Sequence, residues 1–373
     1  MTSPTPLRAA ATTEAVRGAV RRLSAVQPGA YRVVSCYLKL EPRDKTRGKY
    51  LIKMKNRVRE VATGLARRGL ERNERETIAA DLERVQACFE EPGRLPPARG
   101  IAIFACARLG LFEFLPLPHV YRSRLAVEST PLVRELVALE QEFGTLLVAA
   151  CDRTGARFFE VTAFDAVELP GLAAPASRGS RFHGERHGIR AGRPAGGAGE
   201  HNYHMRIREE KHRHYAGVAD HIFQIHSQRP LAGLVVAGVG VDAAALLPHL
   251  HSYLHDLVLG VVRLNPKATS LPAVREAALT LRDERLRAWE RAHAEAVREG
   301  VGEGWAVTGV EVTLRALRRG QVRTLLADGH DDDPRLDDAV EEALRQRAQV
   351  DVMYDPRARR GVNGLAALLR FRR

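Results

Sequence analysis

The sequence predicts a mixed α/β protein of three domains, and three observations lead to that prediction. Short apolar segments rich in β-branched residues alternate with longer segments of helical periodicity. The 373 residues exceed the usual size of one domain, and a hydrophobic fraction of 45% is enough for several cores. A polar, Gly-rich stretch over residues 171–201 interrupts the pattern. We expect an N-terminal α/β domain over 1–140, a middle domain over 141–268 and a C-terminal α/β domain over 269–373. The middle and C-terminal domains are expected to hold mixed sheets covered by helices.

The expected N-terminal domain contains three helices and three strands. A basic helix over 45–68 is indicated by Leu51, Met54, Val58, Val61 and Leu65, which recur at helical spacing and mark its buried face. The remaining elements are helices over 13–25 and 74–90 and strands over 31–40, 100–107 and 111–117.

The expected middle domain combines paired strands with a strand–helix–strand segment. We predict strands over 144–152, 156–165, 231–240 and 257–264, with helices over 203–228 and 241–250. The stretch 171–201 is too long for an ordinary connection, so we expect it to be functional or disordered. The segment GVGVD (238–242) lacks the full dinucleotide pattern, and a tight strand-to-helix turn is the expected structure.

The expected C-terminal domain is a small α/β unit. We predict helices over 271–299, 308–320 and 331–348, and strands over 321–328, 349–355 and 363–371. An Asp or Pro is well placed at the start of the helix in DDDPRLDDAVEEALRQRA.

The net charge of +13 and the pI near 10.0 favour a polyanionic partner, either nucleic acid or an anionic membrane. No apolar stretch approaches the ~20 residues that a membrane span needs. The first residues contain no uncharged apolar region of the kind that signal peptides carry. Four widely spaced cysteines without a CxxC pattern indicate reduced, mostly buried thiols. We therefore expect a cytoplasmic protein with a nucleic-acid partner and no membrane association.

No residue pattern predicts catalysis, a metal or a cofactor. His201 and His204 are spaced for one helix face, but their neighbours are Arg and Lys, which repel a cation. RNA-facing imidazoles are the favoured role for the histidines of this region. The acidic GHDDDP segment (329–334) is interpreted as a solvated helix N-terminus, with a metal loop as the alternative. We expect no catalytic residue, no metal site and no cofactor.

Basic residues concentrate in two places. From Ser177 to Tyr215 there are nine Arg or Lys, four Glu and six His, and the helix over 45–68 adds a second cationic surface. Such charges can follow a phosphate backbone and release its counterions, whereas the alternative is a pair of solvated faces. The residues expected to contact RNA are Arg178, Arg181, Arg186, Arg190, Arg193, Gly196, Gly197, His201, His204, Arg206, Arg208, Lys211, Arg213, Lys49, Lys53, Lys55 and Arg57.

The segment GGAGEHNYHMRIREEKHRHYAGVADHI resembles the middle domain of eukaryotic and archaeal class-I release factors. Those proteins carry Gly-Gly-Gln on a long loop that is followed by a basic helix. The segments GVEVTLRALRRGQVRTLLAD and GVNGLAALLRF are similar to the third domain of release factors and of Pelota. VVSCYLKLEPRD resembles the start of their first domain less specifically. The chain is identified as a bacterial member of this superfamily, either a Balon-like hibernation factor or a release-factor-like relative.

The sequence departs from that family at the residue on which hydrolysis depends. In release factors the Gln after the two glycines helps to position the water that hydrolyses peptidyl-tRNA, whereas Ala198 and Glu200 stand in this segment. A stop-codon motif of the NIKS type is also missing, and MKNRVR (54–59) does not replace it. The resemblance therefore implies a ribosome-associated translation factor that binds near the A site, through rRNA or tRNA, for hibernation or stalled-ribosome binding without hydrolysis.

Two alternatives stay open: a rescue factor that hydrolyses peptidyl-tRNA with a variant loop, and a general RNA-binding protein. The resemblance also implies a protein partner, elongation factor Tu or another translational GTPase. The surface expected to face that partner is acidic and comprises Asp331, Asp332, Asp333, Asp337, Asp338, Glu341 and Glu342.

Overall fold

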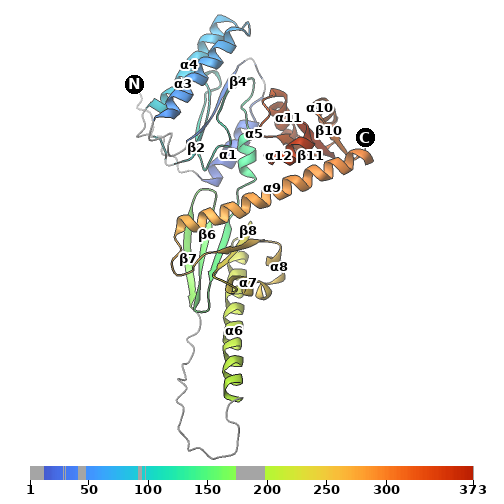
Figure 1. Ribbon diagram of the computed structural model, residues 1–373. Coiled ribbons are helices and arrows are strands. Elements are labelled where there is room, and N and C mark those ends of the chain that lie inside the picture. Colours follow the sequence, from blue (N-terminus) through green and yellow to red (C-terminus); the bar gives the residue numbers. More distant parts are fainter. Residues whose placement is uncertain are drawn as a thin grey trace, which may run out of the picture. The chain divides into compact units, whose positions relative to one another are not determined.

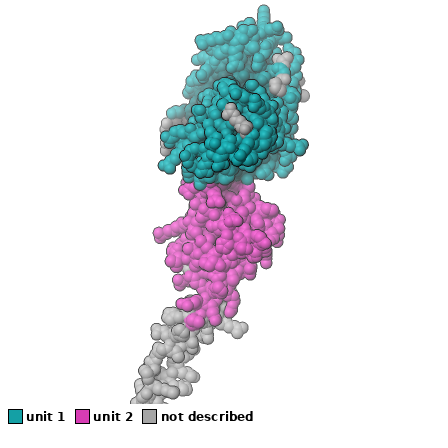
Figure 2. Space-filling view, turned by 90° about the vertical axis from the view of Figure 1, so that its right-hand side faces the viewer, with its two compact units in different colours: residues 1–143, 286–373 teal, residues 144–285 magenta. Residues whose placement is uncertain are grey.

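The computed structural model describes residues 12–27, 29, 31–40, 48–90, 95–96, 98–173 and 198–372, with the backbone alone at residues 198–204, 206, 207 and 242. The chain divides into two compact units (Figure 2). Unit 1 comprises residues 1–143 and 286–373, and unit 2 comprises residues 144–285.

The first sheet of unit 1 is antiparallel throughout and has the strand order β3-β2-β1-β4. Its strands are β1 (Val33–Lys39), β2 (Gly100–Cys106), β3 (Leu111–Leu117) and β4 (Arg124–Glu128). Strands β2 and β3 are joined by the short 3-10 helix η2 (Ala107–Leu109) and by Gly110, whose φ of 63° suits a residue without a Cβ. Every residue of β2 is buried, so both faces of the sheet are covered.

Helices cover the two faces of this sheet. They are α1 (Thr13–Ser24), α3 (Lys49–Ala66), α4 (Arg72–Glu90) and α5 (Arg134–Glu140). Helices α3 and α4 lie side by side on one face, where their apolar residues pack with Cys36 and Ile103 (Figure 1). On the other face, the Tyr37 hydroxyl donates a 2.5 Å hydrogen bond to the Leu132 carbonyl.

The second sheet of unit 1 is mixed and has the order β10-β13-β11-β12. Only the pairing of β11 with β12 is parallel. The strands are β10 (Ala306–Thr308), β11 (Val322–Asp328), β12 (Gln349–Met353) and β13 (Leu365–Leu369). The neighbouring helices are α9 (Leu271–Glu303), α10 (Val310–Arg318), α11 (Pro334–Arg345) and α12 (Pro356–Val362). Asp333 caps α11 by accepting from the amide of Arg335, and Pro334 is the first helical residue.

Buried charged groups join the two sheets of unit 1. Arg134 is only 1% exposed, and its guanidinium donates to the carbonyls of Asp328 (3.1 Å) and Asp331 (2.7 Å). Arg124 donates to the Asp337 carboxylate at 2.7 Å. A charged group is tolerated in a protein interior only when partners replace the water that solvated it. These contacts explain why residues 1–143 and 286–373 form one compact unit.

Unit 2 is built on a mixed sheet of order β7-β6-β5-β8-β9. Strands β5, β8 and β9 pair in parallel, whereas β5–β6 and β6–β7 are antiparallel. The strands are β5 (Leu146–Cys151), β6 (Gly155–Val161), β7 (Ala166–Ala173), β8 (Gly233–Gly238) and β9 (Val258–Arg263). One face carries α6 (Ala198–Gln228), α7 (Asp242–Leu246) and α8 (Ser252–His255), and η3 (Leu247–His249) links the last two. The first part of α9 packs on the other face through Val274 and Ala278.

Helix α6 is longer than the sheet on which it packs. Its 31 residues span about 46 Å, whereas strands of six to eight residues span roughly 20–26 Å. Among the side chains that are described, those of α6 become buried from His214 onward. The N-terminal half of α6 therefore extends beyond the sheet, as Figure 1 shows.

The predicted mixed α/β fold with helix-covered sheets is confirmed. The elements that the sequence did not predict are β4, α5, β7, β10, α8, α12 and the 3-10 helix η2, all of them short or irregular. Strand β7 extends into the region expected to be a loop, because residues 166–173 pair with β6 at the sheet edge, where Pro170 is tolerated. The loop expected over 171–201 is also shortened at its other end by α6. The three-domain division stays a prediction.

Candidate nucleic-acid interface

The positive charge of the chain is concentrated in its N-terminal part. Residues 1–143 contain 25 Lys or Arg and 16 Asp or Glu, which accounts for most of the net charge of +13. Residues 1–143 therefore contribute the largest share of the net positive charge that would attract a polyanion.

Helix α3 carries the densest group of exposed cations in that part of the chain. Lys49, Lys53, Lys55, Arg59 and Arg67 are all exposed, and together they are called the α3 cation surface. The first turn of α3 contains no acidic residue. Cations near a helix N-terminus oppose the helix dipole and cost about 0.3–1 kcal/mol each. The helix dipole therefore does not favour the placement of Lys49 and Lys53 near the start of α3.

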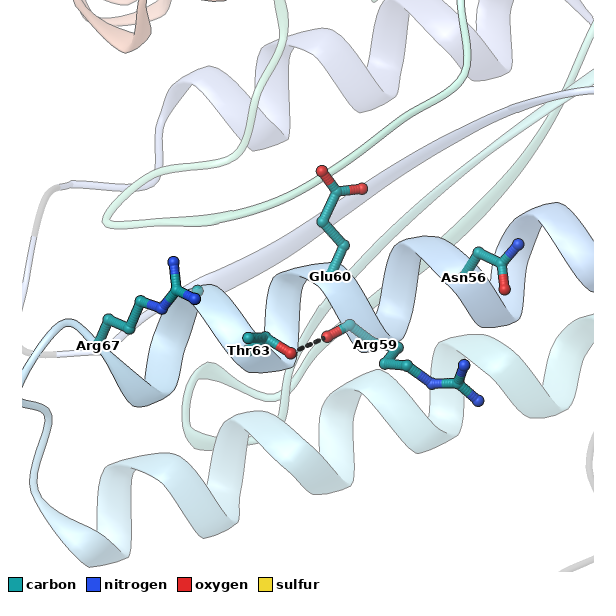
Figure 3. Close-up of a pocket in the computed structure, with 6 residues that line it drawn as sticks. Asn56, Arg59, Glu60, Thr63 and Arg67 are labelled. Carbon is teal, nitrogen blue, oxygen red and sulfur yellow. Dashed lines mark hydrogen bonds between the residues drawn. The ribbon is translucent and has the colours of Figure 1, made fainter.

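An open hollow lies on the outward face of α3 (Figure 3). Residues at successive helical turns line it: Asn56, Arg59, Glu60, Thr63, Gly64 and Arg67. The Thr63 hydroxyl donates to the Arg59 carbonyl at 2.8 Å. A Cβ added at Gly64 would meet no atom within 4 Å, so the glycine keeps the floor of the hollow low. Arg59 and Arg67 are about 12 Å apart along the helix axis, so they can contact phosphates that are not adjacent in a chain.

None of the predicted RNA-contacting residues of α3 lines this hollow. Lys49, Lys53 and Lys55 are exposed, whereas Arg57 is half-buried. Burial raises the pKa of the Cys36 thiol to about 12. The positive charge of the nearby Arg57 lowers this pKa but does not offset the effect of burial. The high pKa keeps Cys36 protonated and therefore unreactive.

The projecting half of α6 is the second cationic element. Arg208 and Arg213 are exposed there, and the Lys211 ammonium lies 5.4 Å from the centre of the Tyr215 ring. His201, His204 and Arg206 belong to α6, but their side chains lie outside the described residues. The other predicted contacts of this region also lie outside the described residues: Arg178, Arg181, Arg186, Arg190, Arg193, Gly196 and Gly197.

His214 does not have the RNA-facing role that was expected for the histidines of this region. Its side chain is 3% exposed, and its Nε2 lies 3.0 Å from the Asp152 carbonyl. Tyr215 is likewise buried. Both residues fall on the side of α6 that faces the sheet, so His214 contributes to the core of unit 2.

The predicted tight turn at GVGVD is confirmed. Gly240 has a φ of 64°, and a Cβ at Gly238 would lie 2.8 Å from the Cys151 carbonyl oxygen. Both glycines are therefore explained by the passage of the chain from β8 into α7, without a ligand.

The acidic surface expected on the C-terminal part was only partly predicted correctly. Asp337 and Glu341 are 3% and 4% exposed, and Asp337 pairs with Arg124 and Arg134 inside unit 1. Because both acids are buried, neither is available to a partner. Asp332 and Asp338 are exposed.

None of the residues that line the hollow was among the predicted site residues: Asn56, Arg59, Glu60, Thr63, Gly64 and Arg67. Their helical spacing, on the side opposite Tyr50 and Met54, is the sequence signal that would have indicated them.

Within the described ranges, no three His, Cys, Asp or Glu side chains come together as a metal site. No helix in the described part of the chain is long and apolar enough to span a membrane.

Comparison with known proteins gives a family match for the middle of the chain and several solved structures of low sequence identity. Residues 131–283 match the bacterial archaeo-eukaryotic release factor family 10. The chain is similar to the archaeal translation termination factor aRF1, with 18% identity over 96% of this chain and 98% of that chain and a TM-score of 0.27. It is also similar to Archaeoglobus fulgidus Pelota (15% identity, 70% and 76% coverage, TM-score 0.39). For Dom34 of S. cerevisiae the values are 10% identity, 70% and 73% coverage and a TM-score of 0.42. No curated protein matches the chain in sequence.

The family match covers nearly all of unit 2, since it extends over residues 131–283. This part of the chain is similar to the bacterial archaeo-eukaryotic release factors.

Proposed function

We propose that this protein is a cytoplasmic, ribosome-associated translation factor that binds near the A site without hydrolysing peptidyl-tRNA. Hibernation or the binding of stalled ribosomes is the physiological role that fits this activity. The proposal follows from the release-factor relationship of residues 131–283 together with one departure from it.

That departure is Ala198, which carries the proposal. It follows Gly196 and Gly197 at the position where release factors have their glutamine, and it begins helix α6. A methyl group can neither donate nor accept a hydrogen bond, so it cannot orient a water for attack on an ester. Glu200 brings a negative charge that an RNA-rich site disfavours.

The α3 cation surface and the projecting half of α6 supply the proposed contacts with rRNA or tRNA. Both elements present exposed Lys or Arg residues, which bind phosphate through charge and through paired hydrogen bonds. A translational GTPase such as elongation factor Tu is the proposed protein partner. Dom34 interacts with Hbs1, and the proposed partnership would parallel that interaction.

A peptide-release assay tests the absence of hydrolysis. Purified protein is incubated with ribosomes that carry labelled peptidyl-tRNA in the P site. We expect co-sedimentation with these ribosomes and no release above the rate without protein. Ala198→Gln serves as the gain-of-function variant, and measurable release by this variant alone would identify residue 198 as the determinant.

The competing hypothesis is a rescue factor with a variant loop. It would be established by robust release with the unaltered protein that disappears in Gly197→Pro, and that result would overturn our proposal. A general RNA-binding protein is the remaining alternative. It would be indicated by binding to free RNA without co-sedimentation with ribosomes at moderate salt.

A further inference from the structure

Three aromatic rings stack in series on the surface of unit 2. Phe223 of α6 lies against His251, with ring centres 4.5 Å apart and planes inclined by 24°. His251 lies in turn against Tyr253 of α8, at 5.0 Å and 14°. The order is therefore Phe223, His251, Tyr253, and it leads from the helix outward.

The outermost ring is open to solvent. Tyr253 is 73% exposed, the largest exposed fraction among the exposed large hydrophobic side chains of the described residues. Its inner face is covered by His251, so the solvent-exposed area lies on its other face. The immediate neighbours Ser252, His255 and Asp256 are exposed and polar. A flat aromatic face with polar groups around it differs from an apolar protein-binding patch, which is surrounded by further apolar side chains.

The local structure holds Tyr253 in place. His251 caps α8, and its Nδ1 lies 3.5 Å from the Tyr253 amide that donates to it. The imidazole is thereby fixed between two rings, and the phenol ring rests on it. A ring that is already ordered loses little conformational entropy when it binds.

We propose that Tyr253 is the outer ring of a stacking platform for an unpaired nucleobase of RNA. Proteins that bind single-stranded RNA combine cations for the backbone with aromatic rings on which bases stack. Arg208 and Arg213 on α6 supply the first component within unit 2, and the Phe223–His251–Tyr253 platform supplies the second. This inference rests on the proposed function and deepens it, because it identifies a base-contacting residue in unit 2.

Fluorescence of 2-aminopurine provides the test, because the fluorescence of this base is quenched when it stacks. A single-stranded RNA that contains 2-aminopurine is titrated with the full chain, and the affinity is measured at several salt concentrations. We expect quenching with the unaltered protein. Tyr253→Ala should abolish the quenching and weaken binding by about 5- to 150-fold, the range for removal of one stacked base. The dependence of affinity on salt should not change, because stacking releases no counterions.

Two further variants make the result specific. Tyr253→Phe keeps the ring and should keep both quenching and affinity. Tyr31→Ala removes another exposed tyrosine, in unit 1 and outside the platform, and should leave quenching unchanged. Because Tyr253 is exposed, its replacement should leave the thermal unfolding temperature unchanged, which excludes misfolding as the cause.

The platform would be refuted by equal quenching with Tyr253→Ala and the unaltered protein. It would also be refuted by Tyr253→Leu retaining full affinity, since an apolar contact would then suffice and a protein partner would be indicated. If ribosome co-sedimentation persists while Tyr253→Ala has no effect, the proposed function stands and the platform does not. If Tyr253-dependent quenching occurs without ribosome binding, the platform stands and the ribosomal function does not.

Discussion

Glu341 on α11 shows how burial changes a single charged group. Its carboxyl is 4% exposed, and burial raises its pKa from 4.5 to about 7, with the nearby charges of Asp338 and Asp337 adding to the effect. A hydrogen bond from Thr130 and the charge of Arg345 act in the opposite direction. The folded protein therefore holds this proton more tightly than the unfolded chain does.

The pH dependence of stability follows from that difference. The favourable contribution of the protonated carboxyl is complete below about pH 4.5 and disappears as the pH rises to about 7. Glu341→Gln removes the titration, so we expect the variant to be more stable than the unaltered protein at pH 8, by roughly 1–3 kcal/mol, and similar at pH 5. Urea unfolding at the two pH values measures this, and a difference that is the same at both would contradict it.

Two glycines allow a matched comparison of packing. A Cβ at Gly238 would lie 2.8 Å from the Cys151 carbonyl oxygen, whereas a Cβ at Gly64 would meet nothing within 4 Å. We expect Gly238→Ala to destabilise the protein by about 1–3 kcal/mol, because the backbone must shift. Gly64→Ala, in the exposed interior of α3, should stabilise it by about 0.5–1 kcal/mol. Thermal unfolding separates the two, and shifts of the same sign would refute the assignment.

At the scale of elements, α3 and α6 combine a packed face with a charged face. The apolar positions of α3 were predicted from their spacing, and Met54 and Leu65 are buried as expected. The same spacing predicts less accurately which residues are exposed. Arg57 was predicted to contact RNA together with the exposed lysines, but its side chain is half-buried. In α6, the length of the helix relative to the sheet decides which part projects.

The contribution of α3 to RNA binding can be measured against a surface of equal charge. We expect Lys49→Ala, Lys53→Ala, Lys55→Ala and Arg59→Ala together to weaken ribosome binding at low salt. The magnitude of the slope of log affinity against log salt should fall by up to about 3.6, or roughly 0.7–0.9 for each phosphate that the variant no longer neutralises.

The control variant removes four exposed arginines elsewhere in unit 1: Arg315, Arg318, Arg319 and Arg323. This replacement removes the same charge and should change the slope much less. Equal effects of the two variants would mean that net charge, rather than the α3 cation surface, determines affinity.

At the scale of the whole molecule, the first and last segments of the chain form one unit. Asp337 has a central role, because its carboxylate lies 2.7 Å from Arg124 Nη2 and 3.2 Å from Arg134 Nε. We expect Asp337→Ala to destabilise the protein by about 3–5 kcal/mol, because it leaves the buried Arg134 and the half-buried Arg124 with less compensation. Asp332→Ala breaks an ion pair with Arg122 in which the aspartate is 81% exposed, and it should cost less than about 1 kcal/mol. Chemical denaturation of the two variants tests this, and similar decreases in stability would show that burial does not strengthen the pairing.

The sequence by itself determined the alternation of helices and strands, the mixed α/β class, the resemblance of the middle segment to release factors and the absence of glutamine after Gly196-Gly197. These are properties of local periodicity, composition and short segments, which do not require knowledge of distant contacts. Only the tertiary structure decided that Asp337, Glu341 and His214 face inward, and that Tyr253 ends a stack of three rings. Those results depend on contacts between residues far apart in the chain, and such contacts leave no periodic signal in a single sequence.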